Sequence, residues 1–253
     1  MIKSRLVAVI VVRDGKVVQS EQFQHNHVIH YDAIHAVNSF SRWDIDEIVI
    51  LNVSRDSSSK NQFLDIIEHV SSECFVPLSV GGFIDDEHYG AELINKGADK
   101  MIINSAFQFN PKLPLLLSNR FGRQCIISSI DVQSFKNEKR VFTNRGQFDT
   151  GVNLPDWIRH CEKNGAGEFF LNNIHHDGMR KGYDLDALDM AVGSTKNPII
   201  MFGGAAIEKH FSDGLDHGAS AVAAANMFHY KELATKRIKR ALLRSNYNMR
   251  KQS

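Results

Sequence analysis

The chain has 253 residues, of which 43% are hydrophobic, so it is long enough to bury a substantial core. Thirty basic and twenty-nine acidic residues leave a formal net charge of +1, which gives no electrostatic reason to expect nucleic acid or an anionic membrane as a partner. The three cysteines are widely spaced and indicate neither a disulfide framework nor a zinc site. No signal-peptide pattern and no apolar run of transmembrane length is present, so we expect a soluble cytoplasmic protein.

Short apolar runs alternate with helical patterns along the chain. The runs predict strands at Leu6–Val12, Glu47–Val53, Val76–Val80, Lys100–Asn104, Cys125–Asp131, Glu168–Ile174, Pro198–Phe202 and Ala221–Ala225. Helical patterns cover Tyr31–Trp43, Phe63–Val70, Asp85–Lys96, Pro111–Phe121, Pro155–Asn164, Leu185–Val192, Ile207–His217 and Lys231–Leu243. Eight such units predict that residues 1–253 form one (β/α)₈ barrel domain, with a doubly wound open sheet as the alternative.

An internal repeat favours the closed barrel. An offset of 121 residues places Pro77 on Pro198 and Gly82 on Gly203, and it also places Glu47 on Glu168. One offset that aligns features across both halves indicates two copies of a half-barrel.

Two insertions separate a strand from the helix that follows it. Arg13–His30 is polar and rich in histidine and predicts a long loop, whereas Lys139–Gly151 predicts a small hairpin that turns at 144–146. Both would lie over the C-terminal end of the barrel, which carries the active site in this fold, so both are candidate lids. The polar tail Ser245–Ser253 predicts a frayed end.

Glycine pairs end the third and seventh predicted strands, at Gly81-Gly82 and Gly203-Gly204. Backbone N–H groups at such positions, before a helix, are open to an anion. A single pair could equally be a tight turn. Two pairs at equivalent positions predict two phosphate sites on one face.

Acidic residues are expected at the same end of the barrel. Asp131 ends an apolar run and should point into the mouth, although it could instead cap the next loop. Asp177 follows two histidines just beyond the sixth strand and is either an acid–base group or a solvated loop acid. His175 and His176 have no third ligand at a recognisable spacing, so we expect no metal and no other cofactor.

Four charged residues stand at strand starts, at the opposite end. Arg5 precedes the first strand, while Glu47, Lys100 and Glu168 open the second, fourth and sixth. They could form a charged ring across the N-terminal mouth, or they could be ordinary surface charge. A ring would require its buried charges to be paired.

From Arg5 to Tyr230 the chain resembles a known family, the cyclase subunit of imidazole glycerol phosphate synthase from histidine biosynthesis. The segments that carry the likeness include Val80-Gly-Gly, Gly97–Ser105, Gly165–Glu168 and Asp177–Asp184. The resemblance implies a duplicated half-barrel, a substrate phosphorylated at both ends, a glutaminase docked on the N-terminal face, and ammonia passing through a charged gate.

The resemblance also implies roles for individual residues. The gate would be Arg5, Glu47, Lys100 and Glu168. The phosphate sites would be Gly82, Asn104, Ser105, Gly178, Gly203, Gly204 and Asn226. Asp131 would be one of two catalytic aspartates, whereas Asp177 is a candidate catalytic acid–base group from its position beside the histidines, as argued above.

Several positions depart from the family pattern, and they concentrate at the C-terminal end. The second catalytic aspartate should stand two residues after Val9, where this chain has Val11. Valine cannot transfer a proton through its side chain. Phe83 replaces a glycine and would crowd one phosphate pocket. The remaining departures are Gln19 for a lysine, Asn52 and His175 for acids, and Asn226 for a serine.

Three functional hypotheses follow from these residues and from the resemblance. The first is a barrel subunit that receives ammonia from a glutaminase and serves amidation of a surface-polysaccharide sugar, with a phosphorylated or nucleotide-sugar ligand and a further sugar amidotransferase as partner. This fits the paralogous branch of the family found with surface-polysaccharide pathways. The second is a working imidazole glycerol phosphate synthase cyclase. The third is a non-catalytic activator of its glutaminase.

Overall fold

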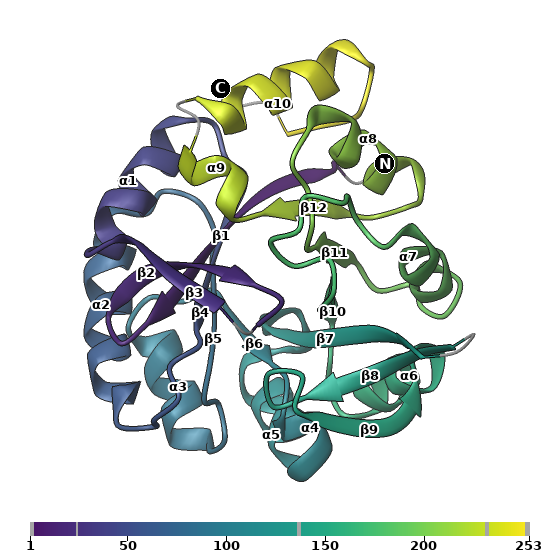
Figure 1. Cartoon of the computed structure of the whole chain (residues 1–253). Coiled ribbons are helices and arrows are strands. Elements are labelled where there is room, and N and C mark those ends of the chain that lie inside the picture. Colours follow the sequence, from purple (N-terminus) through teal and green to yellow (C-terminus); the bar gives the residue numbers. More distant parts are fainter. Residues whose placement is uncertain (1–2, 24, 136–137, 231–232, 251–253) are drawn as a thin grey trace.

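The computed structural model describes residues 3–23, 25–135, 138–230 and 233–250. Within them, eight parallel strands close into a barrel (Figure 1). The strands are β1 (Arg5–Arg13), β4 (Glu47–Asn52), β5 (Leu78–Gly81), β6 (Lys100–Ile103), β7 (Ile126–Phe135), β10 (Glu168–Asn173), β11 (Ile199–Phe202) and β12 (Ala221–Ala224). Strand β12 pairs with β1, and β10 pairs with both β7 and β11, so the sheet has no open side. The (β/α)₈ prediction is confirmed, and the open-sheet alternative is wrong.

Helices surround the barrel. They are α1 (Ala33–Arg42), α2 (Ser59–Glu73), α3 (Glu87–Asn95), α5 (Lys112–Phe121), α6 (Leu154–Lys163), α7 (Leu185–Val192), α8 (Glu208–Asp216) and α10 (Ala234–Arg244). Each overlaps a predicted range, although the last range begins at Lys231, outside the described residues. The short α4 (Ala106–Phe109), α9 (Asn226–Tyr230) and the 3₁₀ turn η1 (Arg123–Cys125) were not predicted. No helix among the described residues is long and apolar enough to span a bilayer.

Helix α6 shows why these segments are helical. The Asn153 side chain accepts a hydrogen bond from the Asp156 N–H, and Pro155 occupies the first turn, where its missing N–H costs nothing. Leu154, Ile158 and Cys161 then fall on one buried face at helical spacing. The other helices bury similar stripes against the outside of the barrel.

Strand alternation divides the core into two layers. In β1, Leu6, Ala8 and Ile10 pack outward against the helices, whereas Val7, Val9 and Val11 face the barrel interior. The inner layer is apolar and receives Val49, Ile102, Ile127, Phe170, Ile200 and Phe202 from the other strands. Val11 therefore projects into the barrel, at the C-terminal part of its strand.

Two antiparallel hairpins extend from the barrel over the C-terminal strand ends. Strands β8 (Glu138–Thr143) and β9 (Phe148–Asn153) form the predicted hairpin. The segment 13–30 is not the predicted long loop, because β2 (Lys16–Glu21) pairs with both β1 and β3 (His25–His30). Strands β2 and β3 form a ribbon that extends from β1 through backbone hydrogen bonds. Such pairing requires few apolar side chains, so the sequence pattern did not indicate it.

The C-terminal tail is not frayed over the described residues. Met249 is only 2% exposed and forms a β-bridge with Ser4. The Arg250 N–H donates to the Ser4 carbonyl at 3.4 Å. The frayed-end prediction is wrong for residues 245–250, because the tail hydrogen-bonds to the segment that enters β1; residues 251–253 lie outside the described part of the chain.

Candidate functional site

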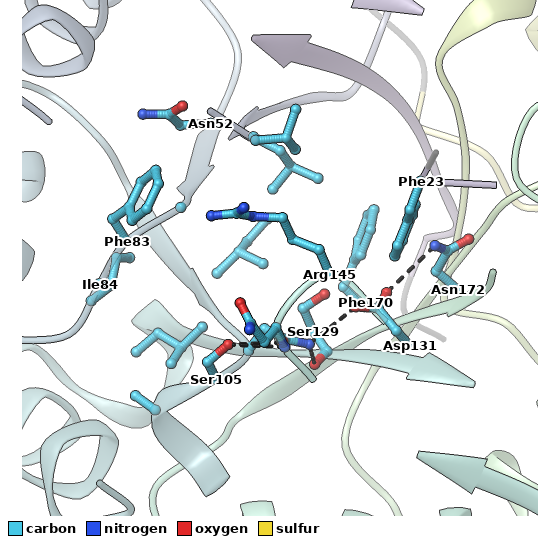
Figure 2. Close-up of a pocket in the computed structure, with 18 of the residues that line it drawn as sticks. Phe23, Asn52, Phe83, Ile84, Ser105, Ser129, Asp131, Arg145, Phe170 and Asn172 are labelled. Carbon is cyan, nitrogen blue, oxygen red and sulfur yellow. Dashed lines mark hydrogen bonds between the residues drawn. The ribbon is translucent and has the colours of Figure 1, made fainter. Parts of the chain in front are cut away.

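A cavity of about 410 Å³ opens among the C-terminal strand ends and the two hairpins; we call it the main pocket (Figure 2). Its polar and charged lining includes Arg13, Ser20, Asn52, Arg55, Asp85, Asn104, Ser105, Asn110, Ser129, Asp131, Asn144, Arg145, Gln147, Asn172 and Asp177. Val11, Leu51, Phe23, Phe83, Phe109, Phe170 and Phe202 are among the apolar residues in its wall. The volume is in the range of small-molecule sites.

Asp131 lies in the wall of the main pocket and is 7% exposed. Its carboxylate accepts hydrogen bonds from the side-chain amides of Asn104 at 3.2 Å and Asn172 at 3.4 Å. Burial raises its pKa to about 7, and the nearby Asp177 acts in the same direction, while the Asn172 hydrogen bond opposes both. At neutral pH this carboxyl is therefore divided between its acid and base forms.

Asp177 is not a solvated loop acid, because it is 5% exposed. The Ser20 hydroxyl in β2 donates to its carboxylate at 2.7 Å, and the Gln22 N–H donates to its carbonyl at 3.1 Å. Burial raises its pKa to about 6, against the opposing effect of the Ser20 hydrogen bond. The β2–β3 hairpin thus holds this acid in place.

A smaller cavity of about 130 Å³ adjoins the main pocket; we call it the second pocket. Four residues predicted for phosphate line it, namely Gly178, Gly203, Gly204 and Asn226. The other three, Gly82, Asn104 and Ser105, line the main pocket. Asp177 borders both cavities. The predicted phosphate residues therefore line two adjoining pockets. Those of the first half of the repeat line the main pocket, and those of the second half line the second pocket.

The β8–β9 turn partly covers the predicted phosphate residues of the main pocket. The Asn144 N–H donates to the Asn104 side-chain oxygen at 3.3 Å and to the Ser105 hydroxyl at 3.2 Å. Phe83 follows Gly82 with a φ of +55°, in the left-handed region that favours glycine, and its ring contributes to the pocket wall. The main pocket is therefore more enclosed and more aromatic than the glycine pattern alone predicts.

Asn172 is a site residue that the sequence did not reveal. The side chain of its neighbour Asn173 donates to Asp184, which also pairs with Lys139 at 2.6 Å. Strand alternation turns Asn172 instead toward Asp131. Ser20 was missed as well, because only the hairpin brings it to Asp177.

The two histidines are not brought together into a ligand set. His175 is exposed, and the His176 Nδ1 lies 2.8 Å from the Gly182 carbonyl oxygen. Within the described ranges, no group of three or more His, Cys, Asp or Glu side chains could hold a metal ion.

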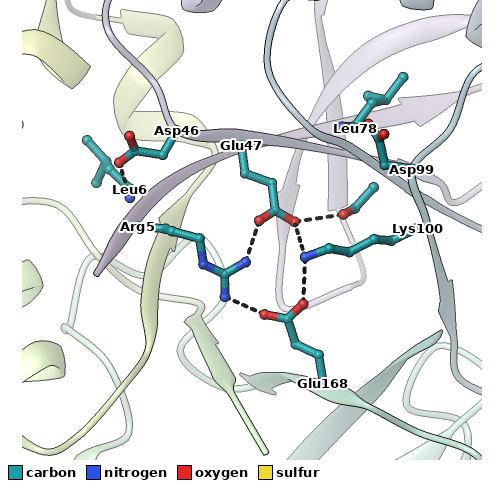
Figure 3. Close-up of polar contacts among 9 residues, drawn as sticks. Arg5, Leu6, Asp46, Glu47, Leu78, Asp99, Lys100 and Glu168 are labelled. Carbon is teal, nitrogen blue, oxygen red and sulfur yellow. Dashed lines mark hydrogen bonds and ion pairs between the residues drawn. The ribbon is translucent and has the colours of Figure 1, made fainter. Parts of the chain in front are cut away.

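At the opposite end, the four charged strand-start residues meet in a closed ring, which we call the charge ring (Figure 3). Arg5 contacts Glu47 at 2.5 Å and also contacts Glu168. Lys100 contacts Glu168 at 2.7 Å and Glu47 at 3.4 Å. Each residue opens its strand, so parallel pairing gathers all four at the N-terminal mouth.

Burial makes this ring different from surface charge. Glu47 is 1% exposed and Glu168 is 4% exposed. The Ser79 hydroxyl also donates to Glu47 at 2.7 Å. Burial acts to lower the pKa of Arg5, but the Glu168 and Glu47 carboxylates outweigh it and raise that pKa. The four charges sum to zero and satisfy one another.

Comparison with known proteins agrees with this architecture. The family model described as "Histidine biosynthesis protein" matches residues 5–234. The chain belongs to this family. It is 35% identical over 250 residues to the imidazole glycerol phosphate synthase subunit HisF of Thermotoga sp. (strain RQ2), covering 99% of this chain and 98% of the relative. The HisF subunit of Natranaerobius thermophilus is 33% identical over 251 residues, covering 99% and 100%.

A third relative of the same name, from Helicobacter hepaticus, is 37% identical over 209 residues, which cover 82% of this chain and 83% of the relative. These names support the predicted resemblance to the cyclase subunit family. They do not support placement in a surface-polysaccharide branch of it. Val11 and Phe83, where the sequence analysis expects departures from the family pattern, both line the main pocket.

Proposed function

We propose that this protein is the barrel subunit of a glutamine-dependent synthase, which receives ammonia at the charge ring and uses it in the main pocket. The supporting observation is that a buried, self-neutralising ring lies at one end of the barrel and two acids of raised pKa lie at the other. Relatives named as synthase subunits support a partner subunit, a glutaminase docked on the N-terminal face. Their names also favour the imidazole glycerol phosphate synthase reaction of histidine biosynthesis.

The barrel interior favours neutral ammonia over the ammonium ion. Between the ring and the pocket the inner layer consists largely of Val7, Val9, Val49, Ile127 and Ile200. An ion would lose its hydration there without a partner, whereas a small neutral molecule loses much less.

The 3.4 Å contact between Lys100 and Glu47 is the longest of the four in the ring. Movement of Lys100 away from Glu47 would open the ring while the two Arg5 contacts persist.

Condensation of ammonia with a carbonyl carbon forms a C=N bond and releases the oxygen as water. In this condensation the nitrogen gives up two protons and the oxygen takes up two, so the site needs a group that accepts protons and a group that donates them. Asp131, with a pKa of about 7, can serve in either role, and Asp177, with a pKa of about 6, is an adjoining base. Asn104 and Asn172 keep the Asp131 carboxylate directed into the pocket.

The two pockets fit an elongated substrate with a phosphate at each end. Gly203 and Gly204 have φ values of +91° and +92°, and a Cβ on Gly203 would collide with the Asn172 side chain. Backbone at these positions can approach an anion more closely than a chain with side chains allows. The second pocket would hold one phosphate, and the main pocket would hold the other.

The test is turnover of the doubly phosphorylated histidine-pathway intermediate by the purified chain, first with an ammonium salt and then with a histidine-pathway glutaminase and glutamine. We expect product in both cases, a loss of at least about a hundredfold in kcat for Asp131→Asn, and a selective loss of the glutamine-dependent rate for Lys100→Met. No turnover with either nitrogen source would refute this acceptor. Unchanged glutamine-dependent turnover in Lys100→Met would refute passage through the ring.

One observation favours a second candidate for the acceptor. Val11 projects into the main pocket and is 6% exposed, so the β1 side of the site offers no proton-transfer group. The second candidate is therefore delivery of ammonia for amidation of a surface-polysaccharide sugar by a further enzyme. Val11→Asp separates the two: a large gain in cyclase rate would mean that valine alone limits a histidine-pathway reaction. Glutamine-dependent ammonia release without any imidazole product, in both forms, favours the sugar acceptor.

A further inference from the structure

Lys139 ties the β8–β9 hairpin to the loop that carries Asp177, and the proposed chemistry does not use it. Its ammonium group donates to both oxygens of the Asp184 carboxylate, at 2.8 Å and 2.6 Å. Lys139 lies near the start of β8, whereas Asp184 is the N-cap residue of α7. The lysine side chain is 12% exposed and the aspartate side chain is 5% exposed. This buried ion pair therefore joins two elements that are 45 positions apart in the sequence.

Asp184 gathers hydrogen-bond donors from three elements. Besides Lys139, the Asn173 side chain at the end of β10 donates to its carboxylate, and the Ala187 N–H of α7 donates at 3.1 Å. Burial alone would raise the pKa of Asp184, but the hydrogen bonds from Lys139 and Asn173 outweigh burial and lower that pKa. The carboxylate therefore stays ionised and connects β8, β10 and α7.

Asn173 connects this carboxylate to the turn that bears Asp177. Its side-chain oxygen accepts a hydrogen bond from the His175 N–H at 2.9 Å. Its carbonyl oxygen accepts from the N–H groups of His176 at 3.0 Å and Asp177 at 3.1 Å. Because its side-chain amide donates to Asp184 and its side-chain oxygen accepts from the turn, Asn173 cannot rotate its side chain without losing both bonds. The geometry of the turn therefore depends on the Asp184 carboxylate.

The opposite end of β8 meets the support of the other acid. Asn144 directly follows β8, and its N–H donates to the Asn104 side-chain oxygen at 3.3 Å. The Asn104 side-chain amide donates in turn to Asp131 at 3.2 Å. The two ends of one strand therefore contact the residues that support both acids of the main pocket.

Folding stability alone does not account for a buried lysine at this position. Burying an ion pair costs the hydration of both charges, and a well-packed apolar pair of similar size is often at least as stable. Asp184 could cap α7 through the Ala187 N–H without any cation beside it. The lysine adds a strong, directional connection between the hairpin and the Asp177 loop.

We propose that Lys139 is a positioning residue for Asp177. With the hairpin over the main pocket, the Lys139–Asp184 ion pair holds the Asn173 amide and thereby keeps the Asp177 carboxyl buried beside Ser20. Without the ion pair the turn loosens, and water reaches the acid. This inference rests on the proposed function only for the claim that Asp177 acts in the main pocket.

The experiment is a pH titration of the Asp177 carboxyl by ¹³C NMR in the purified chain labelled at aspartate, with the signal assigned from Asp177→Asn. It requires no turnover, so its failure and a failure of the proposed reaction are separate results. The variants are Lys139→Met and a double variant, Lys139→Met with Asp184→Asn, which leaves no unpaired buried charge. Lys181→Met removes an exposed lysine from the same loop and is the matched control.

We expect the pKa of Asp177 to fall from about 6 to about 5 or lower in Lys139→Met and in the double variant, because a loosened turn exposes the carboxyl to water. Lys181→Met should retain a pKa of about 6 for Asp177. Loss of a positive charge by itself acts in the opposite direction and would raise the pKa of Asp177.

A pKa of about 7 for Asp131 in every variant would show that the rest of the pocket is intact. If Lys139→Met does not fold, the double variant decides alone. An unchanged or raised pKa of Asp177 in the double variant would overturn the proposal, as would an equal fall in Lys181→Met.

Discussion

Replacing Asp131 with asparagine should stabilise the fold while it removes the acid. In the wild type the ionised, buried carboxylate lowers the stability of the fold above neutral pH, because burial raises its pKa from 3.8 to about 7. The Asp131→Asn variant lacks this charge and has a side chain of nearly the same shape. The substituted amide could also donate to the Asn172 side-chain oxygen, which is buried without a hydrogen-bond partner.

The magnitude follows from the pKa values. A rise from 3.8 to about 7 corresponds to about 4 kcal/mol at roughly 1.4 kcal/mol for each pKa unit. The folded chain retains a proton that the unfolded chain releases between these two values. The free energy of unfolding of the wild type therefore falls as pH rises from about 4 to about 7 and is lowest, in this respect, above 7.

Urea unfolding at pH 5 and at pH 8 measures this effect. We expect Asp131→Asn to be the more stable protein at pH 8, by up to about 4 kcal/mol, with a clearly smaller difference at pH 5. Asp65→Asn, at an exposed position of α2, is the matched control and should differ little from the wild type at either pH. A variant equally destabilised at both values would refute the conclusion that burial of the charge dominates at this residue.

Three further substitutions test other parts of the structure by the same unfolding assay. Lys239→Met removes a lysine with no exposed surface and leaves Asp46 buried without its 2.6 Å partner, which should cost about 3–5 kcal/mol. Glu168→Gln breaks the charge ring and should cost a similar amount, about 3–5 kcal/mol. Gly204→Ala, at a φ of +92°, places a methyl group against the Gly182 carbonyl and should cost at least about 1–2 kcal/mol.

Each has a matched control. Arg240→Met removes a charge from an exposed position of the same helix α10, and Glu87→Gln breaks an exposed ion pair worth about 0–1 kcal/mol. Gly193→Ala has ordinary backbone geometry, with a φ of −67°, and its Cβ would lie 3.3 Å from the Asp189 carbonyl oxygen, compared with 2.3 Å from the Gly182 carbonyl oxygen at Gly204. If a control costs as much as its partner, burial or backbone geometry is not the cause of the loss.

The barrel could be predicted because its signals are local and repeated. Buried parallel strands appear as continuous apolar runs, and the offset of 121 residues marks two halves. The β2–β3 ribbon gave no such signal, since its residues pair through backbone and face solvent on one side. Met249 was missed for a related reason: a single apolar residue in a polar tail does not indicate which surface it will contact.

The site was predicted less completely, because side-chain direction depends on register. Asn172 and Asn173 are adjacent amides, and only the pairing of β10 with β7 decides which one meets Asp131. Arg145 is 90 positions from Arg55 in the sequence, and only the seating of a hairpin turn brings both to one cavity. Such contacts between residues that are far apart in the sequence arise from tertiary packing, and no local sequence pattern predicts them.

The inward direction of Val11 links the two ends of the barrel. Val7, Val9 and Val11 form one apolar line along β1, from the charge ring to the main pocket. Val11, the last of these three valines, extends the apolar lining of the barrel interior by one residue layer. It also leaves the β1 wall of the main pocket without an acidic side chain. Proton transfer in the pocket must then come from the adjacent β7 and β10 side, from Asp131 and Asp177. In the proposed function, the same residue therefore favours delivery of neutral ammonia and makes the reaction depend on a single wall of the pocket.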